Sequence, residues 1–162
     1  MHIRPAAISD LATIRAIYED AILNTTAVYE DEPFTEEYIS KWFAEKQANN
    51  FPVLVCESDG EITGFCTYGH FRLRTLYHPS KEHSVYVHPT WRGQGHGKLL
   101  LQAIIDEARK NKVHTLIGGI DAENEMSIAL HAAYHFKEVA RISEVAFKFG
   151  RYLDLVLMQK IL

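Results

Sequence analysis

Three glycines stand at alternate positions in Arg92–Lys98, which has the sequence RGQGHGK. An apolar, β-branched run, Ser84–Val87, precedes them and ends at Pro89, which removes a backbone donor. From Leu99 on, apolar residues repeat at helical spacing. A strand, a glycine-rich turn and a helix in this order bring free N–H groups and the positive end of a helix dipole to one point. Because glycine has no Cβ to block an approaching oxygen, the stretch predicts a phosphate site.

Two common phosphate-binding motifs do not match this stretch. G-x-x-x-x-G-K-[ST] fails because Lys98 is followed by Leu99, and G-x-G-x-x-G fails because Gly97 comes two residues after Gly95. The pattern that remains is Arg92-x-x-Gly95-x-Gly97. On the loop alone, a simple tight turn stays open as the alternative.

Polar residues that could serve a bound group lie on either side of this loop. Asn124, Ser127 and His131 share one helix face at spacings of three and four. Alternatively, Asn124 caps that helix and His131 is a surface residue. Glu82 stands just upstream of the apolar strand, where a carboxylate is either solvated or a general base.

Two arginines lie in an irregular stretch, residues 69–81, whose length is typical of functional loops. If this stretch is extended, Arg72 and Arg74 point the same way. A guanidinium fork suits a carboxylate or a tetrahedral oxyanion, so the pair predicts an anionic partner. Ordinary solvation at the surface is the alternative.

In this order, the motifs resemble the GNAT family of N-acetyltransferases, whose acetyl-CoA pyrophosphate loop reads Arg/Gln-x-x-Gly-x-Gly after a V-Y-V strand. Four segments look like the phosphinothricin and methionine sulfoximine acetyltransferase branch: Glu82–Val87, Asn124–His131, Lys148–Arg151 and Asp154–Gln159. The resemblance covers nearly the whole chain. It implies the GNAT fold, a mostly antiparallel twisted sheet with helices on both faces.

The resemblance implies an enzyme that uses acetyl-CoA to acetylate the α-amino group of a small amino acid analogue, of the phosphinothricin, methionine sulfoximine or methionine sulfone type. It also implies a homodimer, for which the apolar terminal run Tyr152–Met158 is a further argument. Two alternatives stay open. One is acetylation of another amine, a protein N-terminus or a polyamine, although Arg72 and Arg74 favour an anionic acceptor. The other is a non-catalytic acyl-CoA sensor, against which Glu82 and His131 argue.

By the same resemblance, acetyl-CoA lies along the strand, the glycine loop and the helix that starts near residue 124. The residues expected to contact it are Val85, Tyr86, Val87, Arg92, Gly93, Gln94, Gly95, His96, Gly97, Lys98, Asn124 and Ser127. The residues expected to contact the acceptor are Tyr29, Arg72, Leu73, Arg74, Glu82 and His83.

Acetyl transfer needs a neutral amine and a leaving sulfur that departs as a thiol, so one base and one acid would suffice. The resemblance implies Glu82 as the base, acting directly or through a water on the substrate ammonium. It implies His131 as the acid. A tyrosine often stands at that position in the wider superfamily, and an imidazolium could do the same work near neutral pH.

The sequence departs from the family pattern at two positions. His135 stands where the family usually has a glycine that ends the helix, so we expect either a left-handed residue there or a different helix end. Leu153 stands where members that detoxify the herbicide tend to carry a histidine. This difference favours a methionine analogue over phosphinothricin as the acceptor.

Length and composition favour one domain over residues 1–162, with 47% hydrophobic and 23% charged residues. A net charge of −4 argues against nucleic-acid binding. No signal peptide or apolar run of membrane-spanning length is visible, and Cys56 and Cys66 are expected to be buried free thiols, so we expect a cytoplasmic protein. His131 and His135 lack the glutamate of an H-E-x-x-H site, and no metal is expected.

Periodicity and turn signals predict an α/β domain in the order β-α-α-β-β-β-α-β-α-β-β, a mixed sheet with helices on both faces. Ser9 or Asp10 is expected to cap the first helix, and Thr35 precedes the second. Asp59-Gly60 predicts a hairpin turn. The family resemblance implies a sheet that splays between Ser84–His88 and Thr115–Asp121 to admit the pantetheine arm.

Overall fold

A computed structural model describes residues 1–162. Their strands form one seven-stranded sheet in the order β1-β2-β3-β4-β5-β7-β6. The elements follow the predicted order and have these bounds: β1 His2–Pro5, α1 Leu11–Asn24, α2 Glu36–Ala48, β2 Val53–Ser58, β3 Glu61–His70, β4 Ser80–Val87, α3 His96–Lys110, β5 Thr115–Asp121, α4 Glu125–Ala133, β6 Lys137–Lys148 and β7 Arg151–Ile161. Short 3₁₀ turns, η1 to η3, lie at Ile8–Asp10, Thr75–Tyr77 and Pro89–Trp91. No helix is long and apolar enough to span a membrane.

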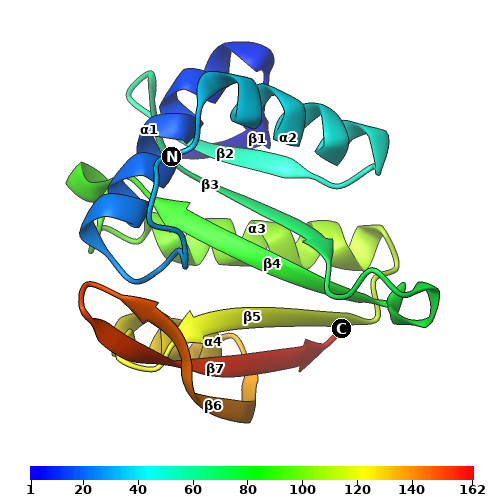
Figure 1. Ribbon diagram of the computed structural model, residues 1–162. Helices are drawn as coiled ribbons and strands as arrows, with labels where there is room; N and C mark the ends of the chain where they lie inside the picture. Colours follow the sequence, from blue (N-terminus) through cyan, green and yellow to red (C-terminus); the bar gives the residue numbers. More distant parts are fainter.

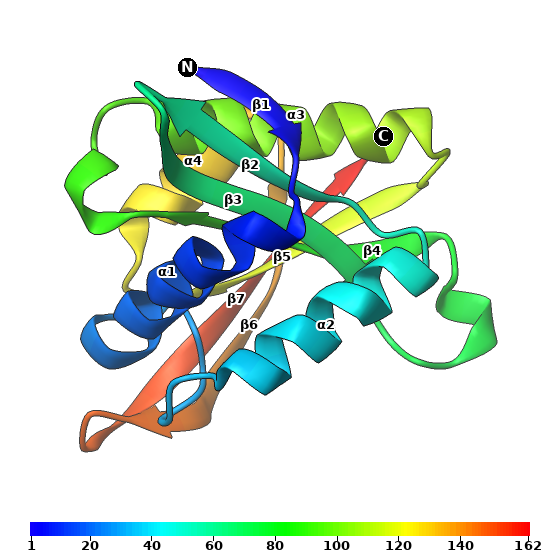
Figure 2. The ribbon, with the colours of Figure 1, turned by 90° about the horizontal axis from the view of Figure 1, so that it is seen from above.

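The helices cover both faces of the sheet, as the sequence predicted. Helices α1 and α2 pack on one face, and α3 and α4 on the other (Figure 2). Every strand pair is antiparallel except β4 with β5. Since side chains alternate along a strand, β4 sends every second residue to each helical layer.

The sheet opens between β4 and β5, as the family resemblance implied. The two strands pair only from Ser80 to Glu82 on β4, opposite Thr115 to Ile117 on β5. Beyond that point they diverge toward their carboxyl ends (Figure 1). From His83 to Val87, the edge of β4 that faces β5 therefore has no strand partner, although the Val87 carbonyl accepts from Arg92 Nε.

Helices α1 and α3 each bury one apolar face. The buried side chains of α1 are Leu11, Ile14, Ile17, Tyr18, Ala21 and Ile22. In α3, the apolar run that was expected at helical spacing starts with Leu99, which is 39% exposed. Helix α3 begins at His96, and its buried face is centred on Leu100, Leu101, Ile104, Ile105 and Ala108.

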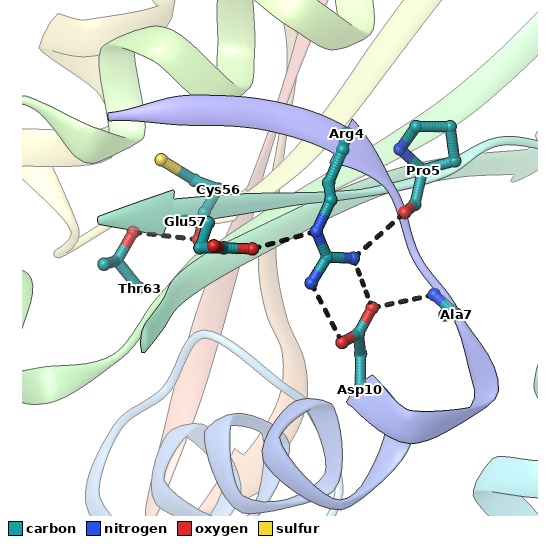
Figure 3. Close-up of polar contacts among 7 residues, drawn as sticks. All are labelled: Arg4, Pro5, Ala7, Asp10, Cys56, Glu57 and Thr63. Carbon is teal, nitrogen blue, oxygen red and sulfur yellow. Dashed lines mark hydrogen bonds and ion pairs between the residues drawn. The ribbon is translucent and has the colours of Figure 1, made fainter. Parts of the chain in front are cut away.

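Asp10 is the N-cap residue of α1, as one of the two predicted positions, but its carboxylate makes no cap hydrogen bond and serves another role (Figure 3). It accepts from Arg4 Nη1 at 2.7 Å and from the Ala7 N–H at 2.7 Å. Arg4 also donates its Nε to Glu57 at 2.9 Å, so this cluster joins β1, η1 and β2. The hydrogen bond from Arg4 holds the pKa of Asp10 below its usual range.

Several local predictions were correct. The Thr35 hydroxyl accepts from the Tyr38 N–H at the start of α2. Asp59 and Gly60 have φ values of 54° and 81°, which close the β2–β3 hairpin. His135, where a glycine was expected, is left-handed with a φ of 65°. Cys56 and Cys66 are free and buried.

Two segments differ from their predicted extent or role. The irregular stretch shrinks to residues 71–79, because His70 and Lys81 still pair across β3 and β4 and place Glu82 inside β4. The apolar run Tyr152–Met158 belongs to β7, which lies between β5 and β6 and buries Leu153, Val156 and Met158. Its apolar character is therefore explained within one chain.

Candidate active site

The glycine loop leaves five consecutive backbone donors without an acceptor in the protein. The N–H groups of residues 93–97 make no backbone hydrogen bond, whereas Lys98 N–H donates to Gly95 C=O. Gly93 and Gly95 have φ values of 76° and 91°, which L side chains rarely adopt. A Cβ on either would meet no protein atom within 4 Å, so the space in front of the N–H groups is open. At the N-terminus of α3, this loop suits a phosphate group.

The side chains of the loop differ in their exposure and in the groups that they contact. Arg92 is exposed, donates its Nε to Val87 C=O at 3.2 Å and pairs with Asp20 of α1. Lys98 is also exposed, whereas Gln94 Nε2 donates to Thr90 C=O at 2.9 Å. The His96 ring is buried, with its Nδ1 2.8 Å from the Thr63 hydroxyl, so only its N–H is directed to the anion site.

A cleft of about 80 Å³ occupies the opening between β4 and β5. Its walls come from β4, β5, α4 and the loop after α1: Ala27, His83, Ser84, Val85, Tyr86, Gly118, Gly119, Ile120, Asp121, Asn124, Ser127 and His131. Of the residues expected to contact the cofactor, Val85, Tyr86, Asn124 and Ser127 meet here. Val87 follows on the same strand edge, where the glycine loop begins.

Glu82 lies where β4 and β5 stop pairing, on the face covered by α1 and α2. A Cβ built on Gly119 of β5 would be 3.2 Å from Glu82 Oε1, so the carboxylate reaches across the mouth of the opening. It is half-buried and forms no ion pair. Burial raises the pKa of Glu82, while the charges of Arg72 and Lys46 lower it. An unpaired carboxylate with a raised pKa is suited to accept a proton.

His83 and His131 form a buried pair on the opposite face of β4. Their Nε2 atoms are 3.0 Å apart, and His131 Nδ1 lies 2.7 Å from Ser127 C=O. A carbonyl can only accept, so His131 donates through Nδ1 and its Nε2 accepts the His83 Nε2–H. His83 Nδ1 is then buried without a partner. Burial lowers the pKa of both rings, that of His83 to about 3, so the pair is neutral at pH 7.

Two further residues of the cleft are held at the carboxyl end of β5. The Asn124 side-chain oxygen accepts from the Ser127 N–H at 3.1 Å and caps α4, which leaves its NH₂ group for a ligand. Asp121 is 3% exposed, and its Oδ1 accepts from the Glu123 N–H at 3.1 Å. Its Oδ2 is buried without a partner. Asp121 was not among the sequence candidates, although its place at a strand end beside the opening would have pointed to it.

The residues expected to contact the acceptor are not all brought together. Arg72 lies over the Phe71 ring at 4.7 Å and is close enough to influence Glu82. Leu73 is 91% exposed, and Arg74 is exposed in the same loop. His83 faces α4, away from Glu82.

Tyr29 donates to Asp154 C=O at 3.3 Å and lines an aromatic cavity of about 300 Å³. The other walls of this cavity are Tyr18, Val28, Glu30, Phe34, Tyr38, Trp42 and Tyr86. Tyr86 also lines the cleft, so the two hollows adjoin at this side chain. Sequence periodicity did not reveal this cavity, because its walls come from distant elements. The structure has no cluster of three His, Cys, Asp or Glu side chains that could hold a metal ion.

Residues 14–136 match the family model described as Acetyltransferase (GNAT) family. The chain belongs to the GNAT family. As a member, it is an acetyltransferase with the GNAT fold. A curated relative, the L-methionine sulfoximine/L-methionine sulfone acetyltransferase of Salmonella typhimurium, is 40% identical over 98% of this chain and 93% of its own.

Two solved structures agree with this GNAT acetyltransferase over nearly its whole length. A structure described as ribosomal-protein-alanine N-acetyltransferase from Brucella melitensis has a TM-score of 0.99 and 44% identity, with all of both chains covered. A phosphinothricin acetyltransferase from Sinorhizobium meliloti, in complex with acetyl-CoA, has a TM-score of 0.97 and 33% identity, over 99% of this chain and 88% of its own. Acetyl-CoA is thus bound in a related GNAT structure.

Proposed function

We propose that this GNAT acetyltransferase transfers the acetyl group of acetyl-CoA to the α-amino group of a small amino acid analogue, of the methionine sulfone or methionine sulfoximine type. The observation that carries the proposal is the unpaired Glu82 carboxylate at the mouth of the β4–β5 opening, with the anion-binding loop at the other end of β4. The relatives that act on such analogues support the choice of acceptor.

The residues present fit acetyl-CoA along β4. The five free N–H groups of residues 93–97 would hold the pyrophosphate, with Arg92 and Lys98 at its edge. The free edge of β4 and the Asn124 NH₂ group would hold the pantetheine amides in the cleft. The bound thioester supplies an activated acetyl group. Pairing with Asp20 keeps the Arg92 guanidinium beside the loop.

In this proposal Glu82 removes the proton that the substrate ammonium must lose before it attacks. An α-ammonium has a pKa of about 8 in peptides, so most of it is charged at neutral pH. A carboxylate whose pKa is raised by burial is a stronger base than a solvated one. No ion pair must break before Glu82 accepts the proton, directly or through a water.

The role of His131 as the acid stays a prediction, and the structure defines what it requires. Its Nδ1–H is engaged by Ser127 C=O, and its Nε2 faces His83. To donate from Nε2, His131 would have to receive a proton there. Its lowered pKa favours the neutral ring, and its Nε2 already accepts the His83 Nε2–H, so donation to a leaving sulfur would first require that contact to break.

Arg72, whose charge acts on Glu82 from the loop before β4, would hold the anionic groups of the acceptor. Arg74 and Leu73 are exposed on the same loop, free to close over a bound amino acid. Tyr29 would form a wall on the opposite side, at the aromatic cavity. Acetylation of an inhibitory amino acid analogue would detoxify it.

We also propose that the protein forms a homodimer through β6 and that it is located in the cytoplasm. Strand β6 is an edge of the sheet, and apolar side chains on it and beside it are exposed: Val139, Ile142, Val145, Phe147, Phe149 and Tyr152. Such an edge invites pairing with another chain. The buried free thiols fit a reducing compartment.

Turnover with three acceptors tests the proposed function. We expect kcat/KM for methionine sulfone to exceed that for spermidine and for a short peptide with N-terminal alanine. Preference for the peptide would instead support acetylation of a protein N-terminus, the activity named for the Brucella melitensis structure. Binding of acetyl-CoA without turnover of any acceptor would support a sensor.

A further inference from the structure

Lys46 of α2 carries a half-buried ammonium without a carboxylate partner. Its Nζ donates to Tyr68 C=O at 2.8 Å. It lies 5.8 Å from the centre of the Trp42 ring and 5.7 Å from that of Phe51. One carbonyl and two aromatic faces therefore hold the charge in place.

This ammonium lies above the strand position beside Glu82. Gly69 of β3 pairs with Glu82 across the sheet, so the two residues share a face. A Cβ on Gly69 would be 3.1 Å from Lys46 Nζ, so the absent side chain leaves the space that the ammonium occupies. Residues directly opposite each other have Cβ atoms about 4.5–5.5 Å apart. Lys46 is thus a close neighbour of the Glu82 carboxylate and not its ion-pair partner.

A general base benefits from a positive charge nearby that does not form an ion pair with it. Burial raises the pKa of Glu82, which without a cation nearby would leave more of the base protonated. A direct ion pair would lower that pKa and also occupy the oxygen that must take the proton. A cation anchored elsewhere favours the ionised carboxylate and leaves its oxygens available.

Few other charged groups face Glu82. Arg72 acts on it from the loop before β4. Tyr86 shares its face of β4 but is neutral, since burial raises the pKa of Tyr86 to about 12. The chain neighbours Lys81 and His83 point to the other face by strand alternation. Burial lowers the pKa of Lys46 to about 8, so Lys46 is still charged below that pH.

We propose that Lys46 is a positioning residue that keeps Glu82 ionised near neutral pH by its charge, without pairing with it. The inference rests on the proposed role of Glu82 as the base. Lys46 lines neither the cleft nor the aromatic cavity, so its removal should move the pH dependence of the reaction rather than abolish it.

The test is the pH dependence of kcat from pH 5.5 to 9 at saturating acetyl-CoA and methionine sulfone. Lys46→Gln removes the charge and can still donate to Tyr68 C=O. In the kcat profile, the acidic limb is the low-pH part, where kcat falls as the base becomes protonated. We expect the acidic limb of Lys46→Gln to move up by about one pH unit, so that kcat at pH 6 falls by up to about tenfold. At pH 8.5, and in the KM for acetyl-CoA, the variant should be within about twofold of the wild type, since the base is ionised there in both proteins.

Two variants serve as matched comparisons. Lys81→Gln removes the same charge one residue from Glu82 but on the other face, and should leave the limb in place. Lys46→Arg keeps the charge and should restore the limb. If Lys46→Gln does not fold, Lys46→Met takes its place, because it removes the charge and keeps an unbranched side chain beside the two aromatic rings, and it should move the limb in the same direction.

The outcomes separate this inference from the proposed function. An unmoved limb in a folded Lys46→Gln protein would overturn the inference, as would an equal shift in Lys81→Gln. A loss of kcat that is the same at pH 6 and pH 8.5 would indicate a packing role and overturn it too. Glu82→Gln is measured alongside: if it retains wild-type kcat at pH 6, the proposed base itself fails.

Discussion

Gly95 is the position at which the anion-binding loop can be perturbed most selectively. A Cβ at this glycine meets no protein atom within 4 Å, so the methyl group of Gly95→Ala projects from the loop into open space. If it displaces one charge-assisted hydrogen bond to the pyrophosphate, the loss is about 1.5–3 kcal/mol. The expected result is a rise of about 10- to 100-fold in the KM for acetyl-CoA.

Backbone strain must be separated from lost binding, because a left-handed residue costs alanine about 1–2 kcal/mol. Gly60→Ala is the matched control: Gly60 has a φ of 81° and open space around it, but lies in the β2–β3 turn. Gly60→Ala should keep a KM for acetyl-CoA near that of the wild type.

The assay combines steady-state KM for acetyl-CoA with the melting temperature of each variant, with and without coenzyme A. Ligand binding to the folded state raises the melting temperature, so weakened binding should appear in both measurements. A folded Gly95→Ala protein with wild-type KM, and the full gain in melting temperature, would refute the assignment of the loop.

Three further predictions concern binding, stability and packing. Arg72→Ala should raise the KM for methionine sulfone by about 10- to 100-fold and barely change that for acetyl-CoA; an unchanged acceptor KM would argue against an anion clamp. Asp10→Asn should lower the free energy of unfolding at pH 7 by about 1–3 kcal/mol, because Arg4 loses one of its two carboxylate partners. Since the folded pKa of Asp10 is lowered, this contribution is complete above the unfolded pKa of about 3.9 and fades below it, so urea unfolding at pH 3 should show a smaller loss than at pH 7. Gly118→Ala should cost about 1–3 kcal/mol in urea unfolding, because its Cβ would be 3.0 Å from His83 Cε1; a wild-type midpoint would contradict the rigid packing of that pair.

Local patterns in the sequence were enough to predict the order of elements and the glycine-rich turn before α3. Gly93 and Gly95 were placed correctly because their conformation is a property of the chain itself. The same holds for Thr35 as a cap and for the left-handed His135. Each of these features depends on neighbours in the chain.

Features that depend on contacts between distant elements were missed. Asp10 suits a helix cap by its type, but Arg4 competes for it once β1 is placed beside η1. The neutral His83–His131 pair could not be foreseen, since it joins β4 to α4. Lys46 looked like an ordinary helix-surface residue until the pairing of Gly69 with Glu82 showed what lies beneath it.

The most direct test of the account is kcat of Glu82→Gln with methionine sulfone at pH 6 and at pH 9. Glutamine keeps the size of the side chain and cannot accept the proton. General base catalysis contributes about 10²–10⁴-fold, so we predict a loss of at least about 100-fold at pH 6 with little change in KM. At pH 9 part of the loss should be recovered, because solvent then deprotonates the amine. A Glu82→Gln enzyme with wild-type kcat at pH 6 would contradict the account.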